Sequence, residues 1–388
     1  MKQLPDTPKF DTHVCLISDQ ATPNLLPLLD EKWRPRKVVL ATSAAMTARS
    51  GALERLLKTK GIAVETLPLR DVYDYASLCD DFLGFLSNCK DETVALNVTG
   101  GNKLMAVAAQ EVFRANDSAA FYVSIDTDEI VFLSGGHGAP LNAKLKIAES
   151  LRAHGYATQG GETPQISAAQ RDLTARLVDR VETFGLALGQ INSLAQQAKA
   201  TLQCQMTDAQ TDSKKLADML DLFAEAGYVK QVGSTLKFRD EASRFFVNGG
   251  WLEHHLLQIL RDLQGEHPIT DIAFNLNVTH PDGITKNEID VAFMFRNTLH
   301  IIECKTANLA QVGVTKEDKA TESVYRMESL LKFGGLRTRG MIVDYRGAFS
   351  ASDANRNRAQ LSKLEILSGR ELKDAKNFIA RKWMSKTS

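Results

Sequence analysis

Short apolar runs alternate with helical patterns over the first 155 residues of the chain. The predicted strands cover residues 13–18, 37–42, 62–67 and 93–98. The predicted helices cover residues 44–60, 73–89 and 103–115. Strands that are apolar along their whole length and are joined by helices are typical of a parallel sheet covered on both faces. Two further runs, at 119–125 and 130–133, predict a hairpin at the edge of that sheet.

The middle of the chain has a different pattern. Residues 159–164 (QGGETP) are typical of a linker, and the following stretch to about residue 246 is rich in helical patterns. A predicted helix at 214–226 is followed by GYVKQVGSTLKF, in which two short strands flank Gly233 and Ser234. This order fits a winged-helix motif, and it fits a small helical connector with a hairpin equally well.

A third unit begins near residue 249. It contains a helix at 250–263, a strand at 272–278, a hairpin at 288–305, a helix that ends near 333, a strand at 340–344 and a charged helical tail. The fold class is therefore α/β with three parts. We predict a Rossmann-like parallel-sheet domain over 1–157, a winged-helix-like connector over 165–247 and a second α/β domain over 248–388.

Composition and charge narrow the function only slightly. The 388 residues are 44% apolar and 24% charged, and the 47 basic residues balance the 47 acidic ones. Charge is unevenly placed, because residues 326–388 hold 14 Lys and Arg against 6 Asp and Glu. A basic end of this kind is compatible with a polyanionic substrate.

Cysteine use and hydropathy indicate a cellular compartment. The five cysteines form no C-x-x-C pair, which disfavours zinc ribbons and redox motifs, and their odd number suits a reducing environment. The first residues lack the apolar core of a signal peptide, and no run reaches 18 apolar residues. We expect a cytoplasmic protein with no membrane partner.

The stretch NEIDVAFMFRNTLHIIECKT, residues 287–306, carries the clearest chemistry. A two-residue turn at Arg296 and Asn297 would place Asp290 opposite Glu303. Because side chains alternate along a strand, Lys305 would share a face with Glu303. Two carboxylates and an ammonium within apolar strands predict a site for Mg²⁺ or Mn²⁺, in which Lys305 stabilises phosphate charge or orients water. The alternative is a solvated face with salt bridges.

This arrangement resembles the PD-(D/E)xK nuclease superfamily, with Asp290 as its aspartate and Glu303-Cys304-Lys305 as its E-x-K. The proline that usually precedes the aspartate is replaced by Ile289. Members often add a glutamate from the preceding helix, and Glu253 is the candidate here. The resemblance implies catalytic roles for Asp290, Glu303 and Lys305 and metal ligation by Asp290, Glu303 and Glu253.

Several neighbours of these residues have a structural interpretation as well as a functional one. His254 and His255 follow Glu253 on one helix and point about 100° apart, so we expect both to be structural. Cys304 would face away from the acids, into a core. Tyr325 and Arg326 would either contact substrate or pack their helix against the sheet.

A second informative stretch is NVTGGNKLMAVAAQE, residues 97–111. A buried strand ends in T-G-G-N-K and runs into a helix, whose first N–H groups could bind an anion. Other strands end at the same edge, where open α/β sheets bind ligands. The candidate ligand-binding residues are Ser18, Asp19, Gln20, Thr42, Ser43, Thr99, Gly100, Gly101, Asn102 and Lys103. The alternative is a plain turn with Asn102 as the helix cap.

The order strand, T-G-G-N-K, helix resembles the ligand-sensing CARF domain of CRISPR-associated proteins. Together the two resemblances cover most of the chain and imply a CARF–nuclease of type III CRISPR systems. Such enzymes are homodimers that bind a cyclic oligoadenylate, commonly cyclic tetra-adenylate, and then cleave single-stranded RNA or DNA or nick supercoiled DNA with a divalent metal.

Two other functions fit the sequence. One is a non-catalytic, ligand-controlled regulator whose winged helix binds duplex DNA, and the other is a restriction or repair nuclease that cuts without any cyclic nucleotide. The complete Asp, Glu and Lys set argues against a degenerate nuclease.

Overall fold

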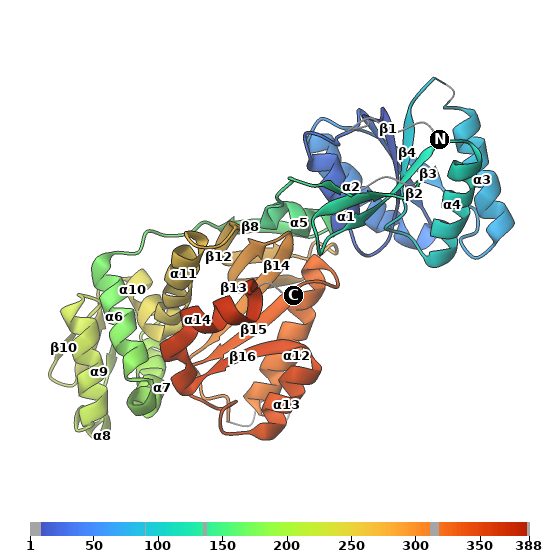
Figure 1. Ribbon diagram of the computed structural model, residues 1–388. Helices are drawn as coiled ribbons and strands as arrows, with labels where there is room; N and C mark the ends of the chain where they lie inside the picture. Colours follow the sequence, from blue (N-terminus) through green and yellow to red (C-terminus); the bar gives the residue numbers. More distant parts are fainter. Residues whose placement is uncertain (1–8, 90, 135–137, 311–317, 386–388) are drawn as a thin grey trace.

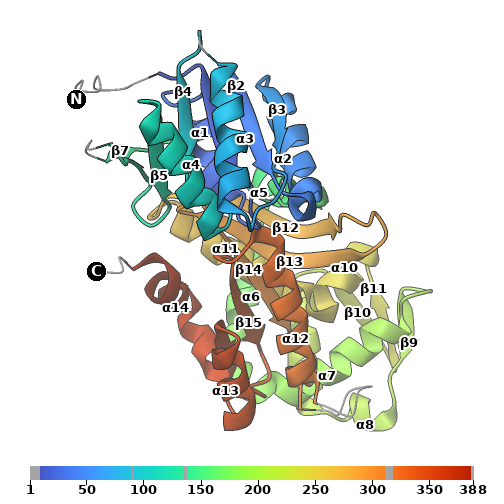
Figure 2. The ribbon, with the colours of Figure 1, turned by 90° about the vertical axis from the view of Figure 1, so that its right-hand side faces the viewer.

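The computed structural model describes residues 9–89, 91–134, 138–310 and 318–385. Two α/β units lie one above the other, and the helices of the middle region pack beside the second unit (Figures 1 and 2). The mixed α/β fold that the sequence predicts is confirmed.

The N-terminal domain is built on a seven-stranded sheet within the described residues. Its order is β3-β2-β1-β4-β5-β6-β7, parallel from β3 to β5 and antiparallel beyond. The strands are β1 (Thr12–Leu16), β2 (Lys37–Thr42), β3 (Ala63–Pro68), β4 (Val94–Asn97), β5 (Ala119–Ser124), β6 (Glu129–Phe132) and β7 (Ala139–Pro140). The helices are α1 (Thr22–Leu29), α2 (Thr47–Thr59), α3 (Tyr75–Ser87), α4 (Lys103–Ala115) and α5 (Ile147–Ala153), with a 3₁₀ turn at Ala44–Met46.

Helices cover both faces of this sheet, as the apolar strands predict. All five residues of β1 are buried, because Val14 and Leu16 pack in one core cluster and Cys15 in another. Helix α1 was not predicted from the sequence, because Pro23 and Pro27 lie inside it. Pro23 lies in the first turn, where a missing N–H is tolerated.

The C-terminal domain contains a six-stranded sheet in the described part of the chain, ordered β16-β15-β14-β13-β12-β8. Its strands are β8 (Ala157–Gly161), β12 (Ile269–Thr279), β13 (Lys286–Phe295), β14 (Thr298–Lys305), β15 (Arg339–Asp344) and β16 (Leu364–Ser368). Its helices are α11 (Trp251–Gln264), α12 (Lys319–Leu331), α13 (Asp353–Leu361) and α14 (Ala375–Ile379). Shorter helical turns lie at Phe246–Gly250, Lys332–Gly334, Gly369–Asp374 and Ala380–Met384.

Two sequence predictions for this domain were wrong. Residues 159–161, predicted as linker, belong to strand β8, which pairs with β12 at the sheet edge. Gly160 and Gly161 have φ of +74° and +93° and lie beside an irregularity in β12, so these glycines fit a β-bulge and not a loop. The tail predicted as helical contains strand β16.

The middle region forms a small helical unit with a three-stranded sheet, β10-β11-β9, among the described residues. In chain order it consists of α6 (Ala168–Asp179), α7 (Val181–Gln197), β9 (Gln203–Gln205), α8 (Asp208–Thr211), α9 (Lys214–Glu225), β10 (Val229–Val232), β11 (Thr235–Phe238) and α10 (Glu241–Phe245). The predicted hairpin is present, with Gly233 at φ +60° in its turn.

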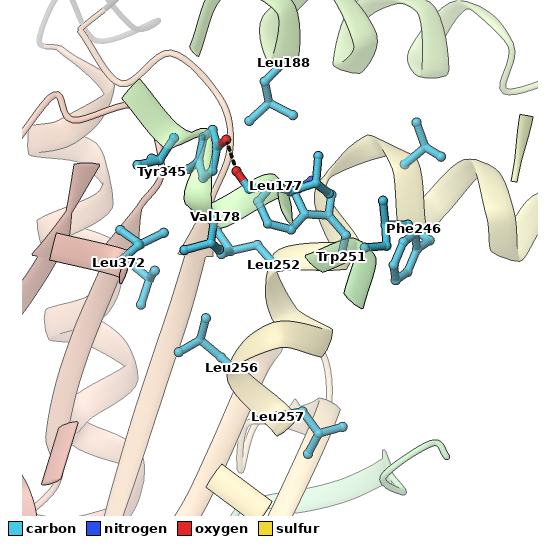
Figure 3. Packing of buried hydrophobic residues seen from close by; sticks show 14 of the residues in the cluster. Leu177, Val178, Leu188, Phe246, Trp251, Leu252, Leu256, Leu257, Tyr345 and Leu372 are labelled. Carbon is cyan, nitrogen blue, oxygen red and sulfur yellow. Dashed lines mark hydrogen bonds between the residues drawn. The ribbon is translucent and has the colours of Figure 1, made fainter. Parts of the chain in front are cut away.

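This unit shares one core with the sheet of the C-terminal domain. Figure 3 shows Leu177 of the middle region against Trp251 and Tyr345, and the Tyr345 hydroxyl donates a 2.6 Å hydrogen bond to the Leu177 carbonyl. Trp251 and Tyr345 are fully buried. A shared core of this kind makes the middle region part of the C-terminal body, not a loose tether.

Among the helices of the described ranges, none is long and apolar enough to cross a membrane.

Candidate active site and ligand site

The β13–β14 hairpin has the predicted turn and register. Arg296 and Asn297 have φ of +48° and +54°, the left-handed conformation that a two-residue hairpin turn requires. Phe295 pairs with Thr298, and the ladder continues to Val291 and Ile302. One step further sets Asp290 opposite Glu303.

Glu303 is the most deeply buried carboxylate of this site, with 1% of its surface exposed. Its Oε1 accepts a hydrogen bond from Lys305 Nζ at 2.5 Å, and Arg326 Nη1 of α12 lies 3.4 Å from the same oxygen. No described residue offers a hydrogen bond to Glu303 Oε2. One oxygen is therefore held by two cations while the other is buried without a partner.

Asp290 and Glu253 complete the acidic cluster. Asp290 Oδ2 accepts a 2.7 Å hydrogen bond from the backbone N–H of Cys304, and burial together with the charge of Glu303 raises the pKa of Asp290 to about 7. Burial, followed by the charges of Asp290 and Glu288, raises the pKa of Glu253 to about 9. The charges of Asp290 and Glu303 act on Glu253, and the charge of Glu303 acts on Asp290, so the three predicted acids lie within electrostatic range of one another.

The chain reaches this arrangement through a kink before α11. Gly249 has φ of +118°, and a Cβ there would lie 2.4 Å from Thr306 Oγ1, next to Lys305. Asn192 of α7 donates to the same hydroxyl at 3.1 Å. Because Gly249 permits this close approach, the first turn of α11, with Glu253, packs against the end of β14.

The donor set fits a divalent cation. Carboxylate oxygens are the ligands that Mg²⁺ and Mn²⁺ prefer, and Glu253 Oε2, like Glu303 Oε2, has no hydrogen-bond partner in the described residues. Within the described ranges, however, no three acidic, His or Cys side chains are gathered closely enough to surround an ion. In this arrangement Lys305 and Arg326 form ion pairs with Glu303.

The neighbouring residues have mainly structural contacts. Burial raises the pKa of the Cys304 thiol well above its usual value, which suits a core residue. His254 Nδ1 lies 2.8 Å from the Gly250 carbonyl, and His255 Nδ1 lies 3.3 Å from Thr174 Oγ1. Neither ring bonds to the acids.

The sequence left the role of Arg326 open, and it did not identify Asn275 as a residue of the site. Arg326 contacts both Glu303 and, at 3.3 Å, the Glu288 carbonyl, so it belongs to the site. The Asn275 side chain opposes the rise in the pKa of Glu253 from an irregular position in β12, where the φ of Asn275 is +49°. An asparagine within the apolar run AFNLNV was the available signal.

Part of the basic end, residues 326–388, is engaged in ion pairs. Lys373 pairs with Glu182 at 2.9 Å and Lys376 with Glu266 at 2.6 Å, whereas Lys382 pairs at 2.9 Å with Glu365 of the same basic end. The first two pairs hold the basic end against the rest of the C-terminal body, and all three leave fewer free cations for a polyanion.

The predicted ligand site lies where β4 ends in the N-terminal domain. A Cβ on Gly100 would lie 1.9 Å from the Leu16 carbonyl oxygen, and Gly101 has φ of +70°. Asn102 caps α4, because its Oδ1 accepts from the Met105 N–H at 2.8 Å. Lys103 begins the helix and is exposed. Both glycines are therefore required by the turn.

Polar contacts beneath the turn position it against its neighbours. The Thr99 hydroxyl donates to Asn97 Oδ1 and accepts from the Val123 N–H, each at 2.7 Å. Buried Asn97 in turn donates to Asn24 Oδ1 and to the Pro23 carbonyl, at 3.0 Å each. Thr99 thus links β4 to β5.

The polar side chains at the neighbouring strand ends differ in how accessible they are to a ligand. Ser18 Oγ accepts from the Gln20 N–H at 3.3 Å, and the exposed Asp19 pairs with Arg49 at 3.4 Å. Ser43 is half-buried. The Thr42 hydroxyl is buried and bonds to Ser50 and the Leu40 carbonyl, so it faces inward.

Two family models match the parts of the chain that carry the candidate sites. Residues 12–150 match the family described as Card1 CARF domain, and residues 239–386 match the family described as Card1-like, endonuclease domain. No curated protein sequence matches the chain.

Solved structures resemble the whole chain. Protein VC1899 from Vibrio cholerae is 25% identical over 95% of this chain and 97% of its own, with a TM-score of 0.85. Can2 from Sulfobacillus thermosulfidooxidans, in complex with cyclic tetra-adenylate, is 24% identical over 96% of both chains, with a TM-score of 0.76. A type III CRISPR defence DNA nuclease activated by cyclic oligoadenylate is 18% identical over 88% of this chain and 46% of its own, with a TM-score of 0.54.

The two sites therefore occupy two recognised domains, and the chain is a nuclease by its endonuclease domain. The chain therefore belongs to the Card1-like CARF nucleases, with a Card1 CARF domain followed by a Card1-like endonuclease domain.

Proposed function

We propose that this protein is a metal-dependent nuclease, activated by a cyclic oligoadenylate, that cleaves phosphodiester bonds in single-stranded RNA or DNA. The observation that carries the proposal is the pair of buried, unpartnered carboxylate oxygens of Glu253 and Glu303 beside Lys305. A buried polar atom without a hydrogen-bond partner is costly, so a site that keeps two such carboxyl oxygens is suited to bind a cation.

Asp290, Glu303 and Glu253 would hold Mg²⁺ or Mn²⁺. A divalent cation bound there stabilises negative charge on phosphoryl oxygens. Lys305 would donate to a phosphate oxygen or orient the attacking water once its bond to Glu303 is released. Arg326, which is about half exposed at the mouth of the site, would bind a neighbouring phosphate. Ala292 and Ile301 are fully buried on the face of the hairpin that carries Asp290 and Glu303, and they exclude bulk water from it.

The regulator alternative is weakened by the middle region. Its elements follow one another as in a winged helix, and we propose that fold for it. Helix α9, which would enter a DNA groove, exposes Lys214, Lys215, Asp218, Asp221 and Glu225. Three acids against two lysines would repel a polyanion, whereas DNA-binding helices present cations to phosphates.

Cyclic tetra-adenylate is the proposed activator, since the similar Can2 binds that molecule. A ring with internal symmetry suits a two-fold interface, so we propose a homodimer. The exposed apolar side chains of Leu83 and Val107, on α3 and α4 beside the glycine turn, support a partner on this face. Sedimentation that shows only monomer at micromolar concentration, with ligand present, would contradict it.

The test is a cleavage assay with labelled single-stranded RNA, single-stranded DNA and supercoiled plasmid. Cleavage is expected only with both cyclic tetra-adenylate and Mg²⁺ or Mn²⁺, and EDTA is expected to abolish it until excess Mn²⁺ is added. Cleavage without ligand would favour the restriction or repair nuclease. A footprint on a defined duplex without cleavage would favour the regulator.

A further inference from the structure

The turn of the catalytic hairpin is held by the N-terminal domain. Asn297 is 4% exposed, and its side-chain Nδ2 donates to Asp128 Oδ1 at 3.1 Å and to the Ala143 carbonyl at 3.2 Å. Its Oδ1 accepts from the Leu145 N–H at 2.9 Å. All three partners belong to the other domain. Glycine alone would satisfy the turn's positive φ, so the amide has a second role.

From this turn, the two strands lead directly to the acids. Strand β13 runs to Asp290 and β14 to Glu303, and the side chains between them, such as Phe293 and Met294, are fully buried. A closely packed pair of strands transmits displacement instead of absorbing it. The turn and the acidic cluster are therefore the two ends of one stiff element.

In the N-terminal domain, the residues that contact Asn297 are connected to the glycine turn. Thr99 bonds to Val123 in β5, and β5 runs into a turn that contains Asp126 and Asp128. Asp128 meets Asn297, and Asp126 pairs with Arg337 of the nuclease domain at 2.5 Å. Figure 2 shows the N-terminal domain above the ends of β12, β13 and β14. The end of β5 and the turn after it thus connect the predicted ligand turn with the catalytic hairpin.

We propose that Asn297 is the positioning residue through which ligand binding at the glycine turn reaches Asp290 and Glu303. This inference rests on the proposed function, because it concerns the regulation of that nuclease site. It predicts a coupling free energy between ligand binding and substrate binding that depends on the Asn297 amide. Such coupling is reciprocal, so each of the two binding events must strengthen the other by the same factor. Coupling measured in variants is the required support, since proximity alone does not establish a pathway.

The test variant is Asn297→Gly, which keeps the positive φ and removes the amide. Arg296→Gly is the matched control: it changes the neighbouring turn residue, whose exposed side chain lies over the Phe295 ring. Asp271→Ala is a second control, because Asp271 accepts from the Ile147 N–H across the same boundary at 2.9 Å but lies on β12, outside the hairpin.

The readouts are the ratio of cleavage rates with and without cyclic tetra-adenylate and, separately, ligand affinity by calorimetry. Asn297→Gly is expected to lower the ratio at least tenfold while ligand affinity changes less than threefold. Both controls are expected to keep the ratio within twofold. Asp128→Ala should reproduce the loss, and the double variant should lose no more than either single one.

The outcomes separate this inference from the proposed function. A wild type that ligand does not activate would refute the proposed function itself. A wild type that is activated, together with a normal ratio in both Asn297→Gly and Asp128→Ala, would overturn the role of Asn297. Equal losses in Asn297→Gly and Asp271→Ala would also overturn it, because domain docking as a whole would then carry the effect. Thermal melting confirms that each variant is folded, and Asn297→Asp replaces the glycine variant if that one is not.

Discussion

The two candidate sites are built in opposite ways. The ligand turn consists of backbone N–H groups, two glycines and an exposed lysine, and its polar side chains bond to neighbouring strands. The nuclease site buries acids whose pKa values burial raises to about 7 and about 9. The first depends on shape and the second on charge held away from water. Backbone changes should therefore damage the first site, and charge changes the second.

The largest expected effect is on the charged site. Asp290→Asn, Glu303→Gln and Lys305→Ala should each lower cleavage by about 1000-fold, because cation binding and phosphate stabilisation act as one unit. Single-turnover cleavage at saturating ligand measures this. Ligand affinity, measured by calorimetry, should be unchanged, since the residues lie in the other domain. Full activity of Glu303→Gln with EDTA present would refute the metal site.

This hairpin was predictable because its signals are local. A two-residue turn sets the strand register, and the alternation of side chains then places Asp290, Glu303 and Lys305 without any further information. Glu253 needed the family resemblance, because its position depends on the kink at Gly249. Arg326 reaches the site from α12, and no short sequence pattern reports how a helix packs against a sheet.

The second-largest effect is expected from a substitution that disturbs the backbone of the ligand turn. Gly100→Ala places a methyl group 1.9 Å from the Leu16 carbonyl oxygen, a main-chain atom that cannot move aside alone. We expect a loss of about 3 kcal/mol in the free energy of unfolding and loss of ligand binding. Urea unfolding measures the first quantity.

Gly84→Ala is the matched control for that change. Gly84 is exposed on α3 with no atom within 4 Å of its Cβ position, so alanine should stabilise the helix by up to about 1 kcal/mol. Equal stability of the two alanine variants would mean that the turn at Gly100 has room for a Cβ atom.

The glycine pairs show which part of the fold could not be predicted from the sequence. Gly100 and Gly101 were correctly placed in a turn after a strand, whereas Gly160 and Gly161 were placed in a linker although they belong to β8. Glycine indicates an unusual backbone conformation in both cases. Whether that backbone is a turn or a bulge depends on the partner strand, β12, more than 100 residues away in the sequence.

Lys103 should show a smaller effect that is confined to binding. Loss of one charge-assisted hydrogen bond in Lys103→Ala should weaken ligand affinity by about 10- to 100-fold, or roughly 1.5–3 kcal/mol. Cleavage should fall at limiting ligand and recover when ligand is raised, because the metal site is untouched. Superimposed ligand titrations for the variant and the wild type would show that the glycine turn is a structural feature only.

The smallest expected effect compares one buried histidine in each domain. His13 lies in β1 against Phe121, with neither ring nitrogen bonded to a described residue, and burial lowers its pKa to about 3. His300 lies in β14, stacked on Phe293, and burial lowers its pKa to about 3 as well, although Nδ1 lies 3.0 Å from the Thr298 carbonyl.

Both rings are neutral in the folded protein and charge on unfolding below the ordinary pKa of about 6.5. The unfolded chain then binds more protons, so stability is lost as the pH falls from about 6.5 toward 3. Between pH 7.5 and 5.5 each ring should contribute a loss of about 1.4 kcal/mol. His13→Phe should remove its share of this loss, as measured by urea unfolding at the two pH values. His300→Phe should remove a similar share but also lose the contact with Thr298, so it should be the less stable variant at pH 7.5. An unchanged pH dependence in His13→Phe would show that His13 is charged in the folded protein, and that charge within the sheet of the N-terminal domain is tolerated as it is in the nuclease site.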